Sequence, residues 1–433
     1  MTPITLAFLS VVLLFILIFL RMPVAFVMLV IGMGGYAIVV SPGAAFTITV
    51  QTIYSNFSSY SLIVVPLFVW MGFIAFYSGL SSKIYDATYK IVGDLPGGLA
   101  IATVVACTGF GAICGSTTAT AATMSAVALP EMDKYNYKRS FATASIASAA
   151  IIGVMVPPSV IFILYGVSTG ESIADLFMAG VIPGMMLMGA FMLTAWIIAY
   201  RDPSVAPAGP KIAWPDKFRA LFSAGMEVIA IFIAVMGGLF AGWFTPTEAG
   251  AVGVFATLVV TVIRDSLSWD GFKKSLAASV HLSAMILFLV AAAFVYSRFL
   301  AVTGLPAEVA NMAASAPLPP LIVLLLILFA YFILGLFIDG LALVLMTTPI
   351  FYPIALGLGY DPIWFGVIVV LALGMGVITP PVGANVYVVA GVAKDVDVME
   401  IFSGIWPFLA AIIVCIVLLI AFPQIALFLP GLF

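Results

Sequence analysis

Two stretches with consecutive prolines decide the fold: Gly153-Val154-Met155-Val156-Pro157-Pro158-Ser159 and Gly376-Val377-Ile378-Thr379-Pro380-Pro381-Val382-Gly383-Ala384-Asn385. Each lies inside a long apolar run, 140–169 and 362–393. Two prolines in a row remove backbone donors and stop the helix before them, and a proline fits the first turn of a new helix. A single pair could be a simple kink. Two pairs at matching places predict two spans that are unwound midway.

The two stretches belong to an internal repeat with a spacing of 223 residues. The paired positions are Pro23 and Pro246, Pro96 and Pro319, Pro130 and Pro353, and the two double prolines. The chain has 26 prolines, so chance gives roughly one pair at any chosen spacing. Gly111 and Ser116 match Gly335 and Gly340 at 224 residues. We therefore expect a one-residue insertion or deletion in the repeat.

The composition indicates an all-α polytopic membrane protein. Of 433 residues, 64% are hydrophobic and 8% are charged, and the mean hydropathy is +1.30, whereas about 25% of a soluble domain is charged. The net charge of −3 favours no nucleic-acid partner. One histidine and three cysteines, all in apolar runs, offer neither a metal cluster nor a Ser-His-Asp triad. We therefore expect a membrane protein that is not an enzyme.

The basic residues predict the orientation of the spans, because Lys and Arg are enriched in the cytoplasmic loops between spans. Placing the basic joins inside puts 14 of the 15 Lys and Arg there and leaves Arg298 outside. Run 97–130 then enters and leaves on one face and is too short for two spans of about 20 residues, so it predicts a re-entrant hairpin. Run 319–356 predicts a second hairpin from the other face, and both termini come out external. The apolar runs are 4–20, 23–40, 61–79, 97–130, 140–169, 176–200, 221–243, 246–264, 276–300, 319–356, 362–393 and 401–429.

The chain thus divides into two inverted halves. Residues 1–200 form the first repeat, 201–220 a cytoplasmic linker and 221–433 the second repeat. Each half carries one hairpin and one broken span, and segments 80–96 and 301–318 read as amphipathic arms before the hairpins. Inverted repeats with discontinuous helices are typical of secondary transporters, whose site lies between the repeats.

The hairpin tips and the broken spans carry the candidate site. At each, one half-helix ends in free carbonyls, which suit a cation, and the next begins with free N–H groups, which suit an anion. Packing through small residues is the alternative explanation for the Gly-rich first tip. No Lys, Arg or His lies in these segments, and Asp339 is the only carboxylate within the hairpins. Asp339 could bind sodium, relay protons, or simply be bonded to nearby backbone N–H groups.

We therefore predict sodium at the meeting of each tip with its broken span, because hard cations prefer oxygen ligands, and a substrate carboxylate between the tips. The sodium candidates are Ser116, Thr117, Gly153, Val156 and Pro157 in the first half and Gly335, Asp339, Gly376, Thr379 and Pro380 in the second. The substrate candidates are Ser116, Ser159 and Asn385. Apart from sodium as coupling ion, no cofactor is expected.

The chain resembles the large membrane subunit of tripartite ATP-independent periplasmic (TRAP) transporters over nearly its whole length. Cys114 stands where this family more often carries Ser. The resemblance rests on Gly111-Ala112-Ile113-Cys114-Gly115-Ser116, Val156-Pro157-Pro158-Ser159, Phe244-Thr245-Pro246-Thr247-Glu248-Ala249, the segment from Gly335 to Gly340, and Thr379-Pro380-Pro381-Val382-Gly383-Ala384-Asn385.

The resemblance implies an elevator-type transporter of the inner membrane that is driven by a sodium gradient. It implies two partners, a small four-helix membrane subunit and a periplasmic substrate-binding protein, and an organic acid as substrate, such as a sialic acid or a C4-dicarboxylate. A stand-alone sodium- or proton-coupled carboxylate symporter of similar architecture is the alternative. An intramembrane enzyme would need a nucleophile–base pair or a metal cluster, and a channel would not need two inverted hairpins.

Overall fold

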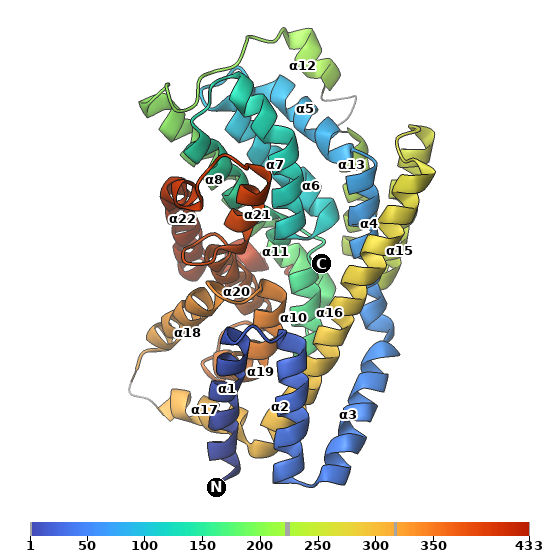
Figure 1. The fold of residues 1–433 in the computed structure, drawn as a ribbon, viewed down its shortest axis with the longest axis vertical. Coiled ribbons are helices and arrows are strands. Elements are labelled where there is room, and N and C mark those ends of the chain that lie inside the picture. Colours follow the sequence, from blue (N-terminus) through green and yellow to red (C-terminus); the bar gives the residue numbers. More distant parts are fainter. Residues whose placement is uncertain (1, 221–225, 316–317, 433) are drawn as a thin grey trace.

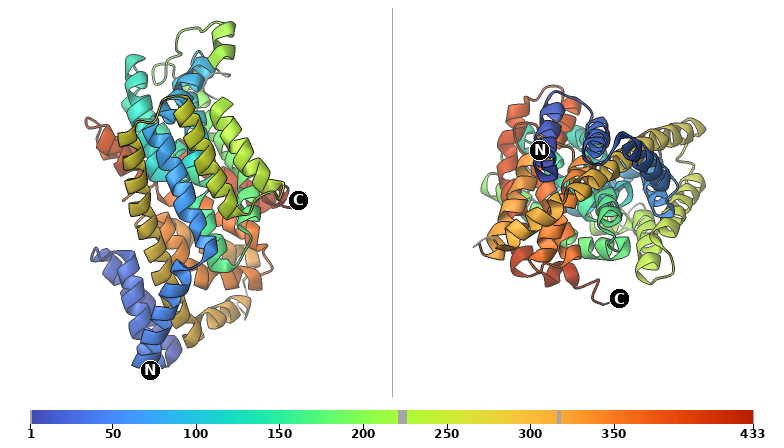
Figure 2. Two further views of the ribbon diagram at one scale, coloured as in Figure 1. Left: turned by 90° about the vertical axis from the view of Figure 1, so that its right-hand side faces the viewer. Right: turned by 90° about the horizontal axis from the view of Figure 1, so that it is seen from below.

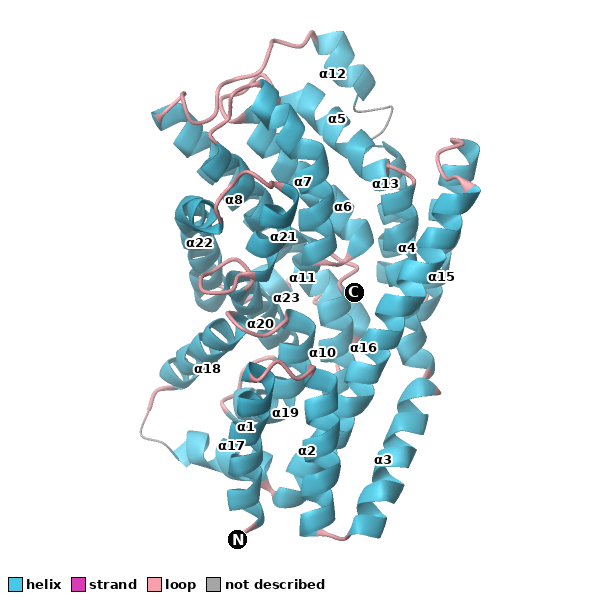
Figure 3. Cartoon of the chain, viewed as in Figure 1, coloured by secondary structure: helices cyan, strands magenta, loops and turns pink. Residues whose placement is uncertain are grey.

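Proline and N-cap residues set where many of the helices begin. The computed structural model describes residues 2–220, 226–315 and 318–432, and every regular element in this part of the chain is a helix (Figures 1 and 3). Ser41 and Thr245, for example, each bond a backbone N–H of the first turn and are followed by a proline. The first half contains α1 Pro3–Phe19, α2 Val24–Val39, α3 Pro42–Phe57, a 3-10 turn Tyr60–Ile63, α4 Val64–Tyr77, α5 Leu80–Val92, α6 Gly98–Cys114, α7 Thr117–Lys134, α8 Arg139–Ala149, α9 Ile152–Met155, α10 Val160–Thr169 and α11 Ile173–Arg201.

The second half repeats this order from the linker onward. It contains α12 Trp214–Ala220, α13 Met226–Phe232, a π turn Ile233–Gly237, α14 Gly238–Phe240, α15 Pro246–Ile263, α16 Trp269–Thr303, α17 Leu305–Ser315, α18 Pro320–Gly335, α19 Gly340–Gly357, α20 Pro362–Gly376, α21 Ala384–Val392, α22 Val398–Ala421 and α23 Gln424–Leu427.

Six helices in the described ranges are long and apolar enough to cross a membrane, and a seventh span results if Arg139–Met155 and Val160–Thr169 are counted as one span bent by 42°. The six are Tyr60–Tyr77, Ile173–Arg201, Pro246–Ile263, Trp269–Thr303, Gly340–Gly357 and Val398–Ala421. Several shorter apolar helices, α6 and α18 among them, reach only part of that length. The chain is therefore a multi-pass membrane protein that mixes full spans with half-length helices.

The packing of the helices shows the inverted repeat directly. Within each half, the first hairpin arm packs on the broken span, α6 on α9 and α18 on α20. Between the halves, the end of each broken span packs on the second hairpin arm of the other half, α10 on α19 and α21 on α7. The outer helices also pack between the halves, because α2 of the first half contacts α16 of the second and α15 of the second contacts α4 of the first. The fold class inferred from the prolines is thus confirmed, while the boundaries at 200 and 221 stay a prediction.

The two hairpins enter the molecule from opposite ends. The α6–α7 hairpin follows arm α5 at the end that also holds α12, and the α18–α19 hairpin follows arm α17 at the end that holds the N-terminus (Figure 1). The view turned by 90° shows the N-terminus and α12 at the same opposite ends (Figure 2). Both hairpins therefore bring their tips toward the middle of the molecule.

Three connections differ from the sequence prediction. Residues 41–60, outside every predicted span, contain α3, which packs on α2 and α16. At the repeat spacing, α3 corresponds to the first part of α16, so α16 is one long helix where the first half has α3 and α4. The 201–220 linker is also partly helical, as α12. The predicted span 276–300 is shorter than α16, because the helix already begins at Trp269, where Ser268 is the N-cap.

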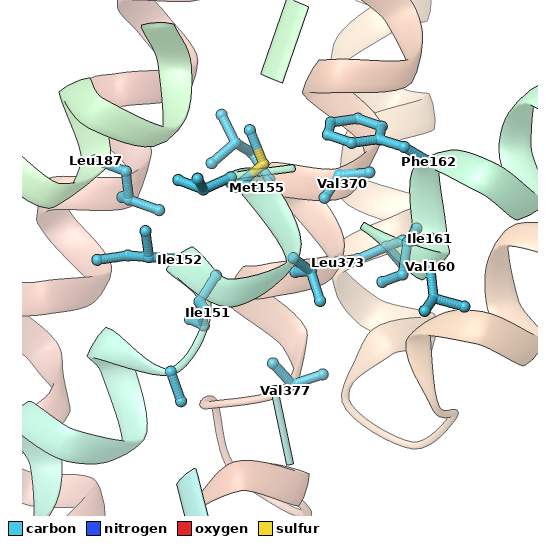
Figure 4. Close-up of a cluster of buried hydrophobic side chains, with 14 of the residues drawn as sticks. Ile151, Ile152, Met155, Val160, Ile161, Phe162, Leu187, Val370, Leu373 and Val377 are labelled. Atoms are coloured by element: carbon cyan, nitrogen blue, oxygen red, sulfur yellow. The ribbon is translucent and has the colours of Figure 1, made fainter. Parts of the chain in front are cut away.

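The two broken spans share one apolar core. In the view of Figure 4, Met155 of α9 and Phe162 of α10 lie on either side of Val370 of α20, and Leu373 follows further along α20. Leu187 of α11 closes this cluster (Figure 4), and all five side chains are buried. The core therefore joins the unwound regions of the two halves into one packed unit.

Candidate functional site

The first hairpin tip is a sharp helix-to-helix turn. Gly115 ends α6 in the left-handed region, at φ 62°, which glycine adopts without a steric penalty. Ser116 then caps α7, because its hydroxyl accepts a hydrogen bond from the backbone N–H of Ala119 at 3.4 Å. The hydroxyl of Thr120 donates to the Ser116 carbonyl at 2.7 Å. The N-terminus of α7 therefore points its remaining N–H groups toward the centre of the molecule.

The second tip has the same plan with a carboxylate as cap. α18 ends at Gly335, and Asp339 accepts a hydrogen bond from the backbone N–H of Leu341 at 3.0 Å. Asp339 therefore occupies the place of Ser116 at a spacing of 223 residues. Pairing Ser116 with Gly340 at 224 was wrong, because the one-residue difference lies inside the tip, between Gly335 and the cap.

Glycines let each hairpin touch its own broken span backbone to backbone. A Cβ added to Gly111 would lie 2.3 Å from the Cα of Gly153. A Cβ added to Gly376 would lie 2.7 Å from the Cα of Gly335. Both distances are far below the ordinary carbon–carbon contact of about 3.5 Å. Three predicted cation-site residues, Gly153, Gly335 and Gly376, thus lie at two repeat-related crossings, and Gly111 is the fourth glycine there.

The double prolines leave carbonyl groups without donors beside these crossings. The N–H of Val156 still closes the end of α9 on Ile152, at 3.0 Å. Beyond it, no donor among the described residues bonds the carbonyls of Val156 and Pro157, nor those of Thr379 and Pro380 in the second half. Both Pro-Pro bonds are cis. Free carbonyls at this depth must be satisfied by water, an ion or a ligand.

A cavity of about 470 Å³ lies between the two tips and the helices α4 and α16. Ser116, Thr117 and Thr118 line it from the first tip, and Asp339, Gly340 and Leu341 from the second. The walls from α4 and α16 are apolar, with Phe73 and Phe76 of α4 and Leu282, Met285 and Ile286 of α16. No described residue in this lining is a Lys, Arg or His. The polar groups of both tips therefore face one space, and Asp339 is the one acidic side chain among the described lining residues.

The structure brings some predicted site residues into the cavity and buries others behind it. Ser116, Thr117 and Asp339 line the cavity, whereas Ser159 and Asn385 are fully buried and lie outside its lining. Ser159 caps α10 by accepting from the N–H of Phe162 at 3.4 Å. The amide nitrogen of Asn385 donates to the carbonyl of Ala147 on α8 at 3.2 Å, and its amide oxygen has no partner among the described residues. Gly153, Val156, Pro157, Gly335, Gly376, Thr379 and Pro380 lie at the two crossings and breaks.

Sequence reasoning missed the cavity walls that α4 and α16 supply. Gly72 of α4 approaches the first tip so closely that an added Cβ would lie 2.9 Å from the Cα of Cys114. Phe73 and Met285 belong to ordinary apolar spans, so their composition gives no sign that they face a cavity rather than lipid. Only the repeat could have helped, and it pairs Gly72 with Val295, which does not line the cavity.

Paired inverted halves, half-length hairpins and unwound spans around a central cavity define a membrane transporter of the inverted-repeat type. The family model for the tripartite ATP-independent periplasmic transporter, DctM component, matches residues 11–425. The chain belongs to this family of transport subunits and is therefore not an enzyme.

Two relatives and one solved structure illustrate the relationship. The sialic acid TRAP transporter large permease protein of Vibrio cholerae is 32% identical over 418 residues, 96% of each chain. The 2,3-diketo-L-gulonate TRAP transporter large permease protein of Escherichia coli is 35% identical over 380 residues, covering 87% of this chain and 88% of that protein. The YdaH transporter of Alcanivorax borkumensis shares the fold with a TM-score of 0.66 and 14% identity, over 88% of this chain and 90% of that one.

Proposed function

We propose that the chain carries out sodium-coupled uptake of an organic acid across the inner membrane, as the transport subunit of a tripartite system. The observation that carries this proposal is the central cavity, where two half-helix N-termini and the hydroxyl groups of the first tip meet and no described lining residue is basic. A carboxylate there must be bound by N–H groups, hydroxyls and cations. The two relatives named above are transport subunits for sialic acid and 2,3-diketo-L-gulonate, which supports an organic acid as the substrate.

The two crossings are the proposed sodium sites. In the first half, the ligands are oxygens of Ser116, Thr117, Gly153, Val156 and Pro157. In the second half, they are oxygens of Gly335, Asp339, Gly376, Thr379 and Pro380. The free carbonyls beside each break support this assignment, since sodium, like other hard cations, prefers oxygen ligands. Bound sodium would also supply the positive charge that the substrate carboxylate needs.

The substrate carboxylate is proposed to lie at the N-terminus of α7, near Ser116. Ser159 and Asn385 would support it from behind the cavity wall, and the unpartnered amide oxygen of Asn385 is free to accept a hydrogen bond. Ser159→Ala and Asn385→Ala should weaken uptake if this is correct. Unchanged uptake and unchanged substrate preference in Asn385→Ala would remove Asn385 from the site.

The remaining parts of the proposal concern orientation, partners and movement. The end with arm α5 faces the cytoplasm, because most Lys and Arg residues lie in the joins there, and both termini are periplasmic. A small four-helix membrane subunit and a periplasmic binding protein complete the system. Residues 97–169 and 319–393 move together against the other spans, because separating a hairpin from its broken span would leave several backbone groups unpaired in lipid, at several kcal/mol each.

The sodium sites can be tested without knowing the substrate. The melting temperature of the purified protein should rise with sodium chloride and stay unchanged with potassium chloride. One site at ten times its Kd stabilises by about 1.4 kcal/mol, and two such sites by about 2.8 kcal/mol. Equal melting temperatures in the two salts would refute sodium binding.

The substrate class needs an uptake assay with the partner proteins present. Proteoliposomes containing this chain with its small subunit and binding protein should accumulate a radiolabelled organic acid, tested as sialic acid and succinate, only with an inward sodium gradient. Uptake without the binding protein would favour the stand-alone symporter, and uptake driven equally by a proton gradient would favour proton coupling.

A further inference from the structure

The linker between the two halves crosses the joint between arm α5 and the first hairpin. After α11 ends at Arg201, residues 202–213 run as a loop over the adjoining ends of α8, α6 and α5, and the chain then enters α12 at Trp214 (Figure 3). α12 packs on α5. The linker is therefore not a free tether but lies against the place where the arm meets the hairpin.

Three backbone hydrogen bonds attach this segment to successive parts of the joint. The Val205 carbonyl accepts from the N–H of Lys138, at the start of α8, at 2.9 Å, and the Ala206 carbonyl accepts from Gly97 at 3.2 Å. The N–H of Gly209 donates to the carbonyl of Gly93 at 2.9 Å. The loop thus bonds the end of α5, the start of α6 and the start of α8 together.

An ion pair adds a fourth attachment. The Nζ of Lys217 lies 2.7 Å from both carboxylate oxygens of Asp94, and the two side chains are only 15% and 21% exposed. The pair of Lys134 and Glu131, by comparison, is 65% and 33% exposed. Exposed ion pairs are screened by solvent and contribute little to stability. The Lys217–Asp94 pair is more shielded than the Lys134–Glu131 pair, so it should hold the linker on α5 more firmly.

The joint itself is short and rich in glycine. Residues 93–98 between α5 and α6 include three glycines, Gly93, Gly97 and Gly98, and Gly97 has φ 71°. A Cβ on Gly98 would lie 2.4 Å from the carbonyl oxygen of Val92. The turn has two hydrogen bonds of its own, from the N–H of Leu95 to the Val92 carbonyl at 3.1 Å and from the N–H of Gly98 to the Leu95 carbonyl at 2.8 Å. The linker adds contacts to this turn from outside.

We propose that residues 202–217 act as a strap that holds the joint between α5 and the first hairpin at its observed angle, with the Lys217–Asp94 pair as its lock. Weakening the lock lets the hairpins leave the conformation described here. The inference rests on the proposed movement of the hairpins, but it needs neither sodium coupling nor a particular substrate.

A contact between α1 and the second tip can report the conformation. The rings of Phe19, in the proposed scaffold, and Phe337, in the proposed moving unit, meet edge to face at 5.4 Å between centroids. In a chain whose Cys107, Cys114 and Cys415 are replaced by Ala, F19C and F337C should be joined by a short bismaleimide. The yield of that reaction measures how often the observed conformation is populated.

Lys217→Ala and Asp94→Ala should each lower the cross-linking yield at least twofold, and the charge exchange D94K with K217D should restore it. The matched control is Lys134→Ala, which removes an exposed ion pair and should leave the yield unchanged. Yields unchanged in both single variants would overturn the proposal. So would losses that the charge exchange does not restore, or an equal loss in the control.

The same readout separates this inference from the proposed function. If the cross-linking yield falls when the ion pair is removed but sodium does not change the melting temperature, the strap is supported and the sodium sites are refuted. A protein stabilised by sodium whose cross-linking ignores the ion pair has the sodium sites and lacks the strap.

Discussion

Adding one methyl group at Gly111 should destabilise the protein by forcing the first hairpin away from its broken span. The new Cβ would lie 2.3 Å from the Cα of Gly153 and 3.1 Å from its nitrogen. Reaching an ordinary contact of about 3.5 Å requires a shift of more than about 1 Å. Both partners are backbone, so no side chain can rotate away. Overpacking costs of this kind reach about 3 kcal/mol.

Part of this cost is offset by helix propensity. Gly111 lies inside α6, where Ala is favoured over Gly by about 1 kcal/mol. The net loss for Gly111→Ala is therefore about 2 kcal/mol. Gly34→Ala is the matched control, because Gly34 also lies inside a helix and an added Cβ would meet no atom within 4 Å. The control should be stabilised by about 1 kcal/mol, so the two variants should differ by about 3 kcal/mol.

Thermal denaturation of the purified proteins measures this difference. Gly111→Ala should melt well below the wild type and Gly34→Ala at or slightly above it. Gly376→Ala should behave like Gly111→Ala, because its Cβ would meet the Gly335 backbone at 2.6 Å. The stabilisation by sodium should also shrink in Gly111→Ala, since the shifted crossing is a proposed ligand site. If Gly111→Ala melts as high as Gly34→Ala, the close crossing does not exist in solution.

Three further predictions concern caps and the linker turn. Ser116→Ala removes the cap of α7 and should cost about 1 kcal/mol of stability, and it should raise the KM for uptake, while a normal KM would place the carboxylate elsewhere. Glu248→Ala opens the capping box in which Glu248 accepts from the N–H of Thr245 at 2.8 Å; it should lower the melting temperature with no change in KM. Hydrogen bonds from the Ser204 hydroxyl and N–H lower the pKa of the Asp202 carboxyl in the linker. The stability that these hydrogen bonds to the Asp202 carboxylate contribute is present above the unfolded pKa of about 3.9 and is lost as the pH falls through the lowered folded pKa. Ser204→Ala should therefore raise the pKa of Asp202 in an NMR titration. An unchanged pKa would contradict the role of Ser204.

Local chemistry explains why much of the fold could be predicted from the sequence. A double proline stops a helix wherever it stands, so the breaks at 157–158 and 380–381 needed no knowledge of their neighbours. A cap such as Thr245 is satisfied by Glu248 three positions away, so a capping box depends on local sequence alone. Span length and the basic joins gave two hairpins entering from opposite ends, because a bilayer leaves backbone few other ways to fold.

The predictions that failed concern segments whose state depends on distant partners. α3 is a polar-rich helix whose place is set by α2 and α16, so its hydropathy did not reveal it. The pairing of Ser116 with Gly340 was wrong because the repeat spacing alone does not locate the one-residue deletion. The structure locates it, since Ser116 and Asp339 are the N-caps of the two equivalent helices.

The sequence by itself determined the all-helical membrane fold, its two inverted halves and the places where the helices are broken, because each follows from the local order of prolines, glycines and apolar runs. Only the tertiary structure decided what surrounds the tips. It placed Ser116 and Asp339 in one cavity, buried Ser159 and Asn385 behind it, supplied walls from α4 and α16, and laid the linker across the joint at 93–98. The physical reason is that the same apolar residue types face a cavity and face lipid. Which of the two a side chain faces depends on helices hundreds of residues away.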